Sequence, residues 1–145
     1  MHKKKNVFID GPISPQFIMN SISSHSTKTE IGGHNIFLGQ VRADSMENKV
    51  VSGIEYTTFL EVADQKLYEI REEAFEKYEL TCLHIYHSLG LVQTGEICLF
   101  VFTSSKHRKA AMEACTFLVE KVKKEVPIWG KEWFDNQDYS WKRNN

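Results

Sequence analysis

The chain has 145 residues and a mass of 16.8 kDa, and 41% of its residues are hydrophobic while 26% are charged. This composition is typical of a globular chain and excludes a disordered or fibrous protein, so we expect a single domain over residues 1–145. The net charge of −1 gives no overall field that would hold a polyanion such as nucleic acid.

The sequence predicts neither a membrane span nor a secretion signal. The longest apolar run, residues 97–102, is far shorter than the roughly 20 residues that a membrane-spanning helix needs. The basic residues 3–5 precede a short apolar stretch, at 7–9, that cannot serve as the core of a signal peptide. We therefore expect a cytoplasmic protein without membrane contact.

The first half of the chain predicts, in order, a strand at 7–9, a helix at 14–24, a strand at 33–42 and a strand at 51–59. Ser14 is the expected cap of the helix, and Pro15 follows in the first turn, where its missing N–H does no harm. A polar loop at 43–49 separates the last two strands, which we expect to pair as a hairpin.

The second half predicts, in order, a helix at 60–78, a strand at 80–88, a strand at 97–102 and a helix at 105–125. Residues 97–102 are apolar on both faces, which is typical of a central strand covered above and below. Pro127 ends the last helix, and residues 128–145 show no clear periodicity. This element order predicts an α+β fold with a mostly antiparallel sheet and three helices.

Charged side chains are unevenly distributed along the chain. Residues 55–80 carry eight acidic and three basic side chains, whereas residues 106–131 carry seven basic and three acidic ones. If Ser105 caps the last helix, three cations, Arg108 among them, and His107 fill its first turn, where the helix dipole disfavours each cation by roughly 0.3–1 kcal/mol. A bound phosphate would remove this conflict; alternatively, the side chains extend into water.

Two other cations lie at the ends of predicted elements. Arg42 closes the strand at 33–42 and could bind a phosphate through its guanidinium, although a solvated strand end explains this residue alone more simply. Lys123 follows the inward-facing Val122 and precedes Pro127 by four residues. We expect it to lie along the edge of the core near Trp129, where a lysine could act as a base or nucleophile.

The cysteines and histidines predict no metal centre. The three cysteines are 16 and 17 residues apart, lack the short spacings of zinc and redox motifs, and are expected to be reduced core thiols. The histidines on predicted strands, His34, His84 and His87, have no cysteine or carboxylate neighbours of the kind that a metal site needs.

With these residues placed, the chain resembles the large, catalytic subunit of the molybdopterin synthase family. The matching stretches run in the family's order over about two-thirds of the chain, at residues 37–42 (FLGQVR), 54–56, 62–64, 87–90, 95–96, 106–108 (KHR), 114–115 and 123–132. The most specific are His107 and Arg108 at a helix start, followed by the pattern K-x-x-x-P-x-W from Lys123 to Trp129.

The resemblance implies an enzyme that installs the two dithiolene sulfurs of molybdopterin on cyclic pyranopterin monophosphate, without a metal or organic cofactor. It implies a small ubiquitin-like partner subunit that carries the sulfur as a thiocarboxylate on its C-terminal Gly-Gly tail. It also implies a homodimer of the large subunit within a heterotetramer, with a pocket shared by both copies, and the hammerhead type of α+β fold.

The resemblance further implies a substrate-binding set of Gln40, Val41, Arg42, His107, Arg108, Lys123, Gly130, Lys131 and Glu132. Lys123 is the expected essential catalytic residue, beside the incoming thiocarboxylate. The family's second lysine follows the tryptophan directly, but this chain has Gly130 there and Lys131 one position later, so Lys131 is the second catalytic candidate. A further departure is Ser88, where relatives often carry arginine.

Two other functions stay open on the residues alone. A non-catalytic α+β module that binds a small phosphorylated ligand would use the same helix-start anion site, but it gives no reason for Lys123 and Trp129 to accompany that site. RNA binding is suggested by the basic N-terminal residues and the three C-terminal tryptophans. The balanced net charge and the presence of only four arginines argue against it.

Overall fold

The computed structural model describes residues 7–142; the basic residues 3–5 and the end of the C-terminal segment, 143–145, lie outside this range. The elements in chain order are β1 (Phe8–Asp10), α1 (Pro15–Ser24), β2 (Gly33–Gln40), β3 (Ser45–Met46), β4 (Lys49–Thr58), α2 (Leu60–Lys77), β5 (Cys82–Gln93), β6 (Ile97–Ser105), α3 (Arg108–Glu125), β7 (Ile128–Phe134) and β8 (Tyr139–Trp141).

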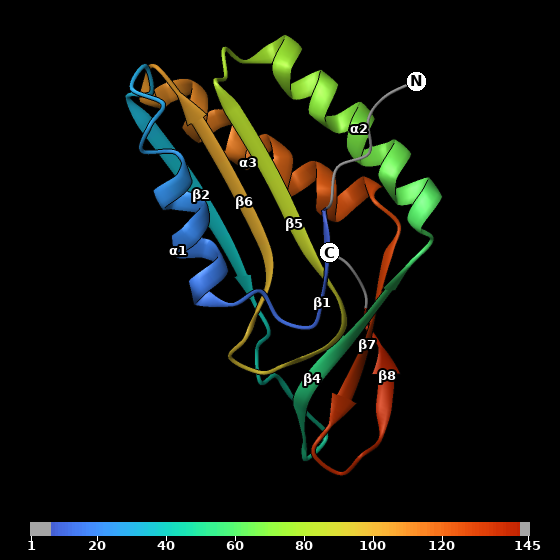
Figure 1. Ribbon diagram of the computed structural model, residues 1–145. Helices are drawn as coiled ribbons and strands as arrows, with labels where there is room; N and C mark the ends of the chain where they lie inside the picture. Colours follow the sequence, from blue (N-terminus) through green and yellow to red (C-terminus); the bar gives the residue numbers. More distant parts are fainter. Residues whose placement is uncertain (1–6, 143–145) are drawn as a thin grey trace.

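The strands form one sheet whose main path is β2-β6-β5-β4-β7-β8, with β1 added to β5 and β3 to β4. The β1–β5 pair is parallel and the other strand pairs are antiparallel. In Figure 1, α2 and α3 lie on one face of the β2-β6-β5 part and α1 lies on the other, while β4, β7 and β8 extend beyond it as a lobe. The predicted α+β class, with a mostly antiparallel sheet and three helices, is confirmed for the described residues.

Strand β5 links the two parts of the sheet. Residues 82–87 pair with β6, and residues 90–93 pair with β4. Gly90, the first residue of the second segment, has a φ of 84°, a backbone conformation that residues with a side chain rarely adopt. This glycine lets one strand serve both the helix-covered part of the sheet and the lobe.

The predicted hairpin between residues 33–42 and 51–59 is wrong. β2 pairs with β6, and β4 pairs with β5 and β7. The connection itself forms the short strand β3, and Glu47 and Asn48, both with positive φ, turn the chain back onto β4. β4 therefore finds its local partner in β3, while β6, which is apolar on both faces, takes β2 as a neighbour.

Two apolar layers cover the central strand β6. Leu99 and Val101 belong to the large core beneath α2 and α3, which includes Leu118, whereas Phe100 and Phe102 belong to a smaller core beneath α1. All five side chains are fully buried. The prediction of a central strand covered on both faces is therefore confirmed.

The helices follow the predicted boundaries closely, except at the start of α3. α1 is capped by Ser14, whose Oγ accepts a hydrogen bond from the N–H of Phe17 at 3.1 Å. The cap residue of α3 is His107, so the expectation that Ser105 caps this helix is wrong. Ser105 ends β6 instead, and its Oγ accepts the N–H of Ala111 at 3.0 Å, which ties the helix start to the strand. Among residues 7–142, no helix is long and apolar enough to cross a membrane.

The C-terminal segment, which lacks periodicity in the sequence, forms β7 and β8. In β7 the residues Gly130, Glu132 and Phe134 are buried, while Lys131 and Trp133 lie on the other face. A glycine and a carboxylate at buried positions hide the alternation of apolar and polar residues by which a strand is normally recognised.

Candidate active site

A cleft of about 560 Å³ opens where the end of β2 meets α3 and the lobe. Residues 37–42 form one wall, Ile54 and Tyr56 of β4 and Glu132 of β7 form another, and the last turns of α3 close the third side. Lys142, directly after β8, completes the lining. The cleft therefore unites segments from both parts of the sheet with the C-terminal end of a helix.

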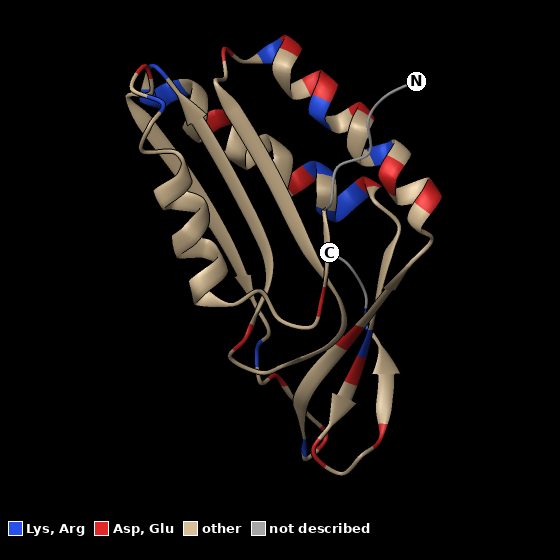
Figure 2. Cartoon of the chain, in the orientation of Figure 1, with Lys and Arg blue, Asp and Glu red and all other residues tan. Residues whose placement is uncertain are grey.

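The cleft is rich in charged side chains, namely the cations Arg42, Lys123, Lys124 and Lys142 and the acids Asp44, Glu120 and Glu132. Figure 2 shows cations gathered in the last turns of α3. Arg42 pairs with Asp44 at 3.3 Å, but its side chain stays 74% exposed. Lys124 pairs with Glu120 at 3.6 Å. Lys123 makes no ion pair with any other residue in 7–142, so its charge is available to an anion in the cleft.

A smaller pocket of about 30 Å³ adjoins the cleft and shares Tyr56, Lys123 and Lys142 with it. The buried His87 lines this pocket. Burial, together with the charge of Lys123, lowers the pKa of His87 to about 4, against the opposing effect of its hydrogen bond to the Ser88 carbonyl oxygen at 2.8 Å. Burial likewise raises the pKa of Tyr56. Both side chains are neutral at pH 7, and His87, which donates through Nδ1, keeps Nε2 as an acceptor.

Part of the predicted site comes together in the cleft, which is lined by Gln40, Val41, Arg42, Lys123 and Glu132. Gly130 lines the adjoining small pocket. Arg42 comes from the end of an edge strand and Lys123 from the end of a helix on one face of the sheet. Two cations from distant parts of the sequence thus line one cleft, where both can stabilise a bound anion.

His107 and Arg108 do not reach this cleft. They lie at the opposite end of α3, where the 15 steps from Arg108 to Lys123 span about 22 Å along the helix axis. Both side chains are exposed, and His107 lines a separate hollow with Lys106 and the end of α2. Within one copy of the chain, the helix-start cations and the cleft are thus two separate places.

Lys131 lies on the opposite face of β7 from Gly130. Its Nζ is 4.4 Å from the ring centroid of Tyr139, 5.3 Å from that of Trp133 and 5.4 Å from that of Trp141. These cation–π contacts hold the ammonium group within an aromatic cluster, away from the cleft. Because successive side chains of a strand point to opposite faces, moving the lysine by one position moves it to the other side of the sheet.

The cleft and pocket also contain residues to which the sequence assigned no role. The N–H of Lys142 donates to the carbonyl oxygen of Gly130 at 2.8 Å, so the end of β8 places this lysine beside the glycine. No sequence signal could reveal it, because β8 has no recognisable pattern. His87 and Tyr56 do have a signal, since each belongs to a stretch that resembles the family, at residues 87–90 and 54–56.

Outside the cleft, His84 does have a cysteine neighbour. Cys82 and His84 are two residues apart on β5 and lie together with His25, which caps the C-terminal end of α1. The expectation that no strand histidine has such a neighbour is wrong for His84, because residues two apart on a strand share a face.

Comparison with known proteins gives the family directly. A family model described as "MoaE protein" matches residues 9–125. The molybdopterin synthase catalytic subunit of Pyrococcus abyssi is 38% identical over 118 residues, which are 81% of this chain and 76% of that protein. The protein of the same name from Bos taurus is 34% identical over 113 residues, which are 78% of this chain. The chain spans 59% of the length of that bovine relative.

Solved structures agree with the sequence comparison. The crystal structure of molybdopterin synthase from Staphylococcus aureus has a TM-score of 0.83 and 28% identity, covering 98% of this chain and 99% of that one. A complex of subunits 1 and 2 of molybdopterin-converting factor from Helicobacter pylori shares the fold, with a TM-score of 0.79 at 20% identity, over 96% of this chain and 90% of that one. On the family match and these relatives, the chain belongs to the MoaE family.

Proposed function

We propose that this chain is the catalytic subunit of a molybdopterin synthase, an enzyme that transfers sulfur to cyclic pyranopterin monophosphate in the cleft beside α3. The observation that carries the proposal is the position of Lys123, which lies where the cleft meets the small pocket. Membership of the MoaE family, and relatives named for this activity, support the proposal.

The positively charged side chains of the cleft suit this reaction, because both of its reactants are anions. The substrate carries a phosphate and the sulfur donor is a thiocarboxylate, so two anions must approach each other. At 4 Å in a partly screened site their repulsion is about 4 kcal/mol. Lys123 offsets it on the α3 side and Arg42 on the β2 side. The thiocarboxylate sulfur is itself the nucleophile, so the site needs no activated serine or cysteine.

The proposed sulfur donor is a small ubiquitin-like subunit whose C-terminal Gly-Gly tail ends in the thiocarboxylate. In each transfer the thiocarboxylate sulfur attacks a substrate carbon, and a carbon–oxygen bond of the substrate breaks as the carbon–sulfur bond forms. Water then hydrolyses the resulting thioester, which leaves the sulfur on the substrate and the tail as a carboxylate. The Helicobacter complex of two subunits, which shares the fold, supports a partner of this kind. We place the enzyme in the cytoplasm, where its free cysteines, Cys82, Cys98 and Cys115, stay reduced.

In this chain we assign the role of the second lysine to Lys142 rather than Lys131. Lys142 lines both the cleft and the small pocket next to Gly130, whereas Lys131 is held on the far face of β7. Lys142→Met is expected to lower kcat/KM at least about tenfold, as loss of a charge in the site. Lys131→Met is the matched control and should leave kcat/KM nearly unchanged; the reverse order of effects would contradict the assignment.

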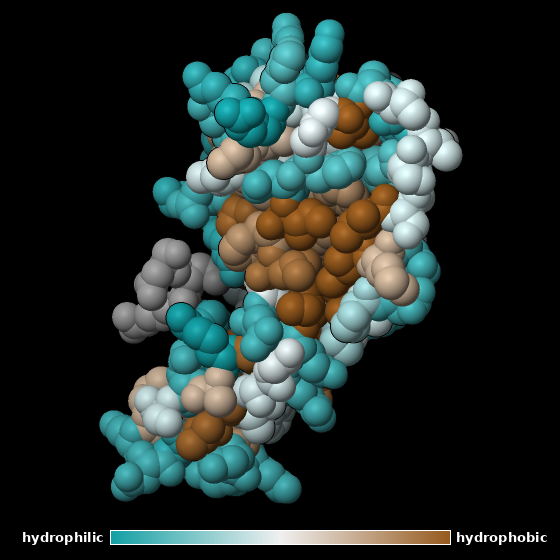
Figure 3. Space-filling view, turned by 90° about the vertical axis from the view of Figure 1, so that its left-hand side faces the viewer, coloured by the Kyte–Doolittle hydropathy of each residue, from teal (hydrophilic) through white to brown (hydrophobic). Residues whose placement is uncertain are grey.

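Two copies of the chain would complete the site. β2 is an edge strand, and its side chains Phe37 and Leu38 are 36% and 41% exposed. Met112, on the neighbouring helix α3, is also exposed. Figure 3 shows a hydrophobic area on the side of the molecule where β2 lies. An exposed edge with apolar side chains favours pairing with a second copy about a twofold axis.

Antiparallel pairing of the two β2 edges would explain the distant helix-start cations. Gly33 at the start of β2 packs against Arg108, where an added Cβ would lie 3.3 Å from the Arg108 Cα, while Arg42 follows the end of β2. When two such strands run antiparallel, the start of one lies beside the end of the other. His107 and Arg108 of one copy would then approach the Arg42 and Lys123 of the second, within a heterotetramer that carries one small subunit on each copy.

The activity is tested with the purified chain, its thiocarboxylated partner and cyclic pyranopterin monophosphate. Dithiolene product is expected from the unmodified protein, and Lys123→Ala should reduce its formation by about 100-fold or more with an unchanged circular dichroism spectrum. Lys121→Ala is the matched control, because this lysine lies on the same helix, pairs with Glu125 at 2.8 Å and does not line the cleft. Tight binding of the substrate without any turnover by the unmodified protein would instead favour the non-catalytic module that binds a phosphorylated ligand.

The shared site is tested by mixing two inactive variants, Arg42→Ala and Arg108→Ala. A mixed dimer holds one site with both substitutions and one with neither. Random exchange of subunits should therefore restore about one quarter of the original activity. No recovery after exchange, although mixed dimers are shown to form, would mean that each site uses residues of one copy only.

A further inference from the structure

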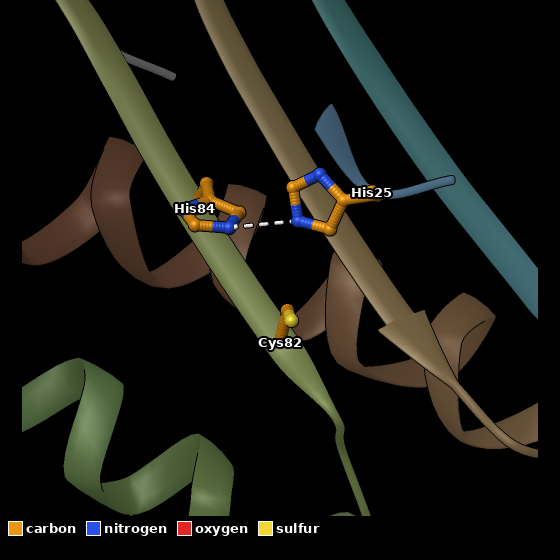
Figure 4. Close-up of side chains that lie close together, drawn as sticks. All are labelled: His25, Cys82 and His84. Atoms are coloured by element: carbon orange, nitrogen blue, oxygen red, sulfur yellow. Dashed lines mark hydrogen bonds between the residues drawn. The ribbon is translucent and has the colours of Figure 1, made fainter. Parts of the chain in front are cut away.

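Three potential metal ligands gather beneath the end of α1, on the sheet face opposite α3. Cys82 and His84 project from the same face of β5, and His25 reaches them from the C-terminal cap of α1 (Figure 4). Their ligand atoms all lie within 4.8 Å of one another, and within residues 7–142 they form the one such group of three. The Nε2 atoms of His25 and His84 are 3.1 Å apart.

The hydrogen bonds around His25 orient its ring as a metal ligand. Its Nδ1 lies 2.7 Å from the carbonyl oxygen of Ser21, and because that oxygen can only accept, Nδ1 must carry a proton. In the neutral ring, Nε2 then presents a lone pair toward His84. A backbone carbonyl bound to the second ring nitrogen is the usual support of a metal-binding histidine. When no ion is bound, a single proton on the His84 Nε2 satisfies both rings.

The cluster is buried on the side of Phe102 and only partly buried at His84. His25 and Cys82 are each 7% exposed, and the ring of Phe102 packs 4.7 Å from that of His25. His84 is only partly buried. Lys28 donates to the Cys82 sulfur at 3.0 Å, and this bond raises the pKa of Lys28. The ammonium group can remain an outer donor to the sulfur when the sulfur binds an ion.

We propose that His25, Cys82 and His84 form a binding site for a divalent transition-metal ion of the zinc class, with water in the fourth position. Two imidazole nitrogens and one thiolate are donors that Zn²⁺ prefers, at about 2.0–2.1 Å and 2.3 Å. Two nitrogens on a tetrahedral ion lie about 3.3 Å apart, close to the observed 3.1 Å. A tetrahedral ion places its sulfur about 3.6 Å from each nitrogen. Since the ligand atoms already lie within 4.8 Å of one another, binding requires a shift of about 1 Å at most.

The ion would stabilise the contact between α1 and β5 and would take no part in the sulfur transfer. Two of its ligands belong to the sheet and the third to the helix end, so binding links elements that otherwise meet through apolar contacts and the His25–His84 hydrogen bond. An ion that binds only the folded chain raises its stability by mass action. None of the three residues lines the cleft or the small pocket, so this site and the proposed activity can fail independently.

The test is a titration of the full chain, free of any polyhistidine tag, with cobalt(II) chloride. One ion per chain should bind with visible bands of a tetrahedral ion and a thiolate-to-cobalt charge-transfer band in the near ultraviolet. Cys82→Ser should abolish the charge-transfer band, and His25→Gln should weaken binding at least about tenfold. The controls are Cys115→Ser, a second buried free cysteine, and His34→Gln, a histidine on the same sheet face; both should leave the spectrum unchanged.

Thermal unfolding gives a second measurement that does not depend on the thiolate band. Zn²⁺ should raise the melting temperature of the unmodified chain and of Cys115→Ser, but not that of Cys82→Ser. If Cys82→Ser fails to fold, the partly exposed His84→Gln replaces it in both measurements. A wild-type chain without the charge-transfer band, or a band that persists in Cys82→Ser, would overturn the proposal.

Discussion

The buried His87 should make the stability of this protein depend on pH in a way that a single substitution removes. The ordinary pKa of histidine, 6.5, falls to about 4 here, chiefly through burial and also through the charge of Lys123. As the pH falls below 6.5, the unfolded chain takes up a proton at this residue, while the folded chain stays unprotonated until about pH 4. The unfolded state binds more protons in this window, so stability decreases as the pH falls.

The size of the effect follows from the two pKa values. The interval from 6.5 to about 4 corresponds to a loss of about 3 kcal/mol of unfolding free energy between neutral pH and pH 4. Such a loss is a large part of the roughly 5–15 kcal/mol that stabilises a typical domain. Other groups titrate in the same range, so the informative quantity is the difference between the wild type and a variant that lacks this imidazole.

Urea unfolding of the wild type and of His87→Gln, at about pH 7 and about pH 4, measures this difference. The variant is less stable at neutral pH, because it loses packing against Tyr56, but its stability should change by about 3 kcal/mol less between the two pH values. His107→Gln removes an exposed imidazole and serves as the control. If wild type and His87→Gln show parallel pH dependences, the buried neutral histidine does not set the acid sensitivity, and the reasoning is refuted.

Three further substitutions test packing and hydrogen bonding within the fold. Gly130→Ala places a Cβ 2.9 Å from the Cγ2 of the buried Ile54 and should cost about 1–3 kcal/mol, seen as a lower melting temperature; a stabilised variant would contradict the close approach. Ser88→Ala removes a fully buried hydroxyl that has no partner in residues 7–142 and should raise the unfolding free energy by about 1 kcal/mol in urea. Thr103→Val removes the bond from Thr103 Oγ1 to the Ala111 carbonyl at 2.6 Å and should cost about 1 kcal/mol by the same measurement, whereas no loss would show that the bond adds nothing net.

The helices could be predicted from the sequence because their signals are local. The caps, the spacing of apolar residues and Pro127 lie within each helix or next to it, so α1, α2 and the end of α3 follow from neighbouring residues alone. Strand pairing is not local. Residues 33–42 and 51–59 are neighbours in sequence, yet their partners are set by which edges the apolar β6 and the turn at Glu47 leave available.

Residues of the candidate site could be predicted only where one short segment of sequence contains all the information that identifies them. Arg42 and Lys123 each stand at the end of an element that the sequence defines well, and both line the cleft. His107 and Arg108 were found by the same reasoning, but a sequence does not show that a helix separates its two ends by several turns. In the proposed dimer those ends meet through contacts between copies of the chain, and such contacts leave no periodic pattern in one copy.

Gly130 shows why a functional charge can change its place in the sequence. Here β7 approaches β4 so closely that even a methyl group would press on Ile54, so a lysine at 130 would have to displace the core of the lobe. Lys131 cannot replace it, because alternation along β7 directs that side chain to the aromatic cluster on the other face. The carbonyl of Gly130 instead binds the N–H of Lys142, which brings a cation to the same pocket from the end of β8. The proposed reaction requires positive charge at a point in space, and in this fold two strands that meet there can each supply it.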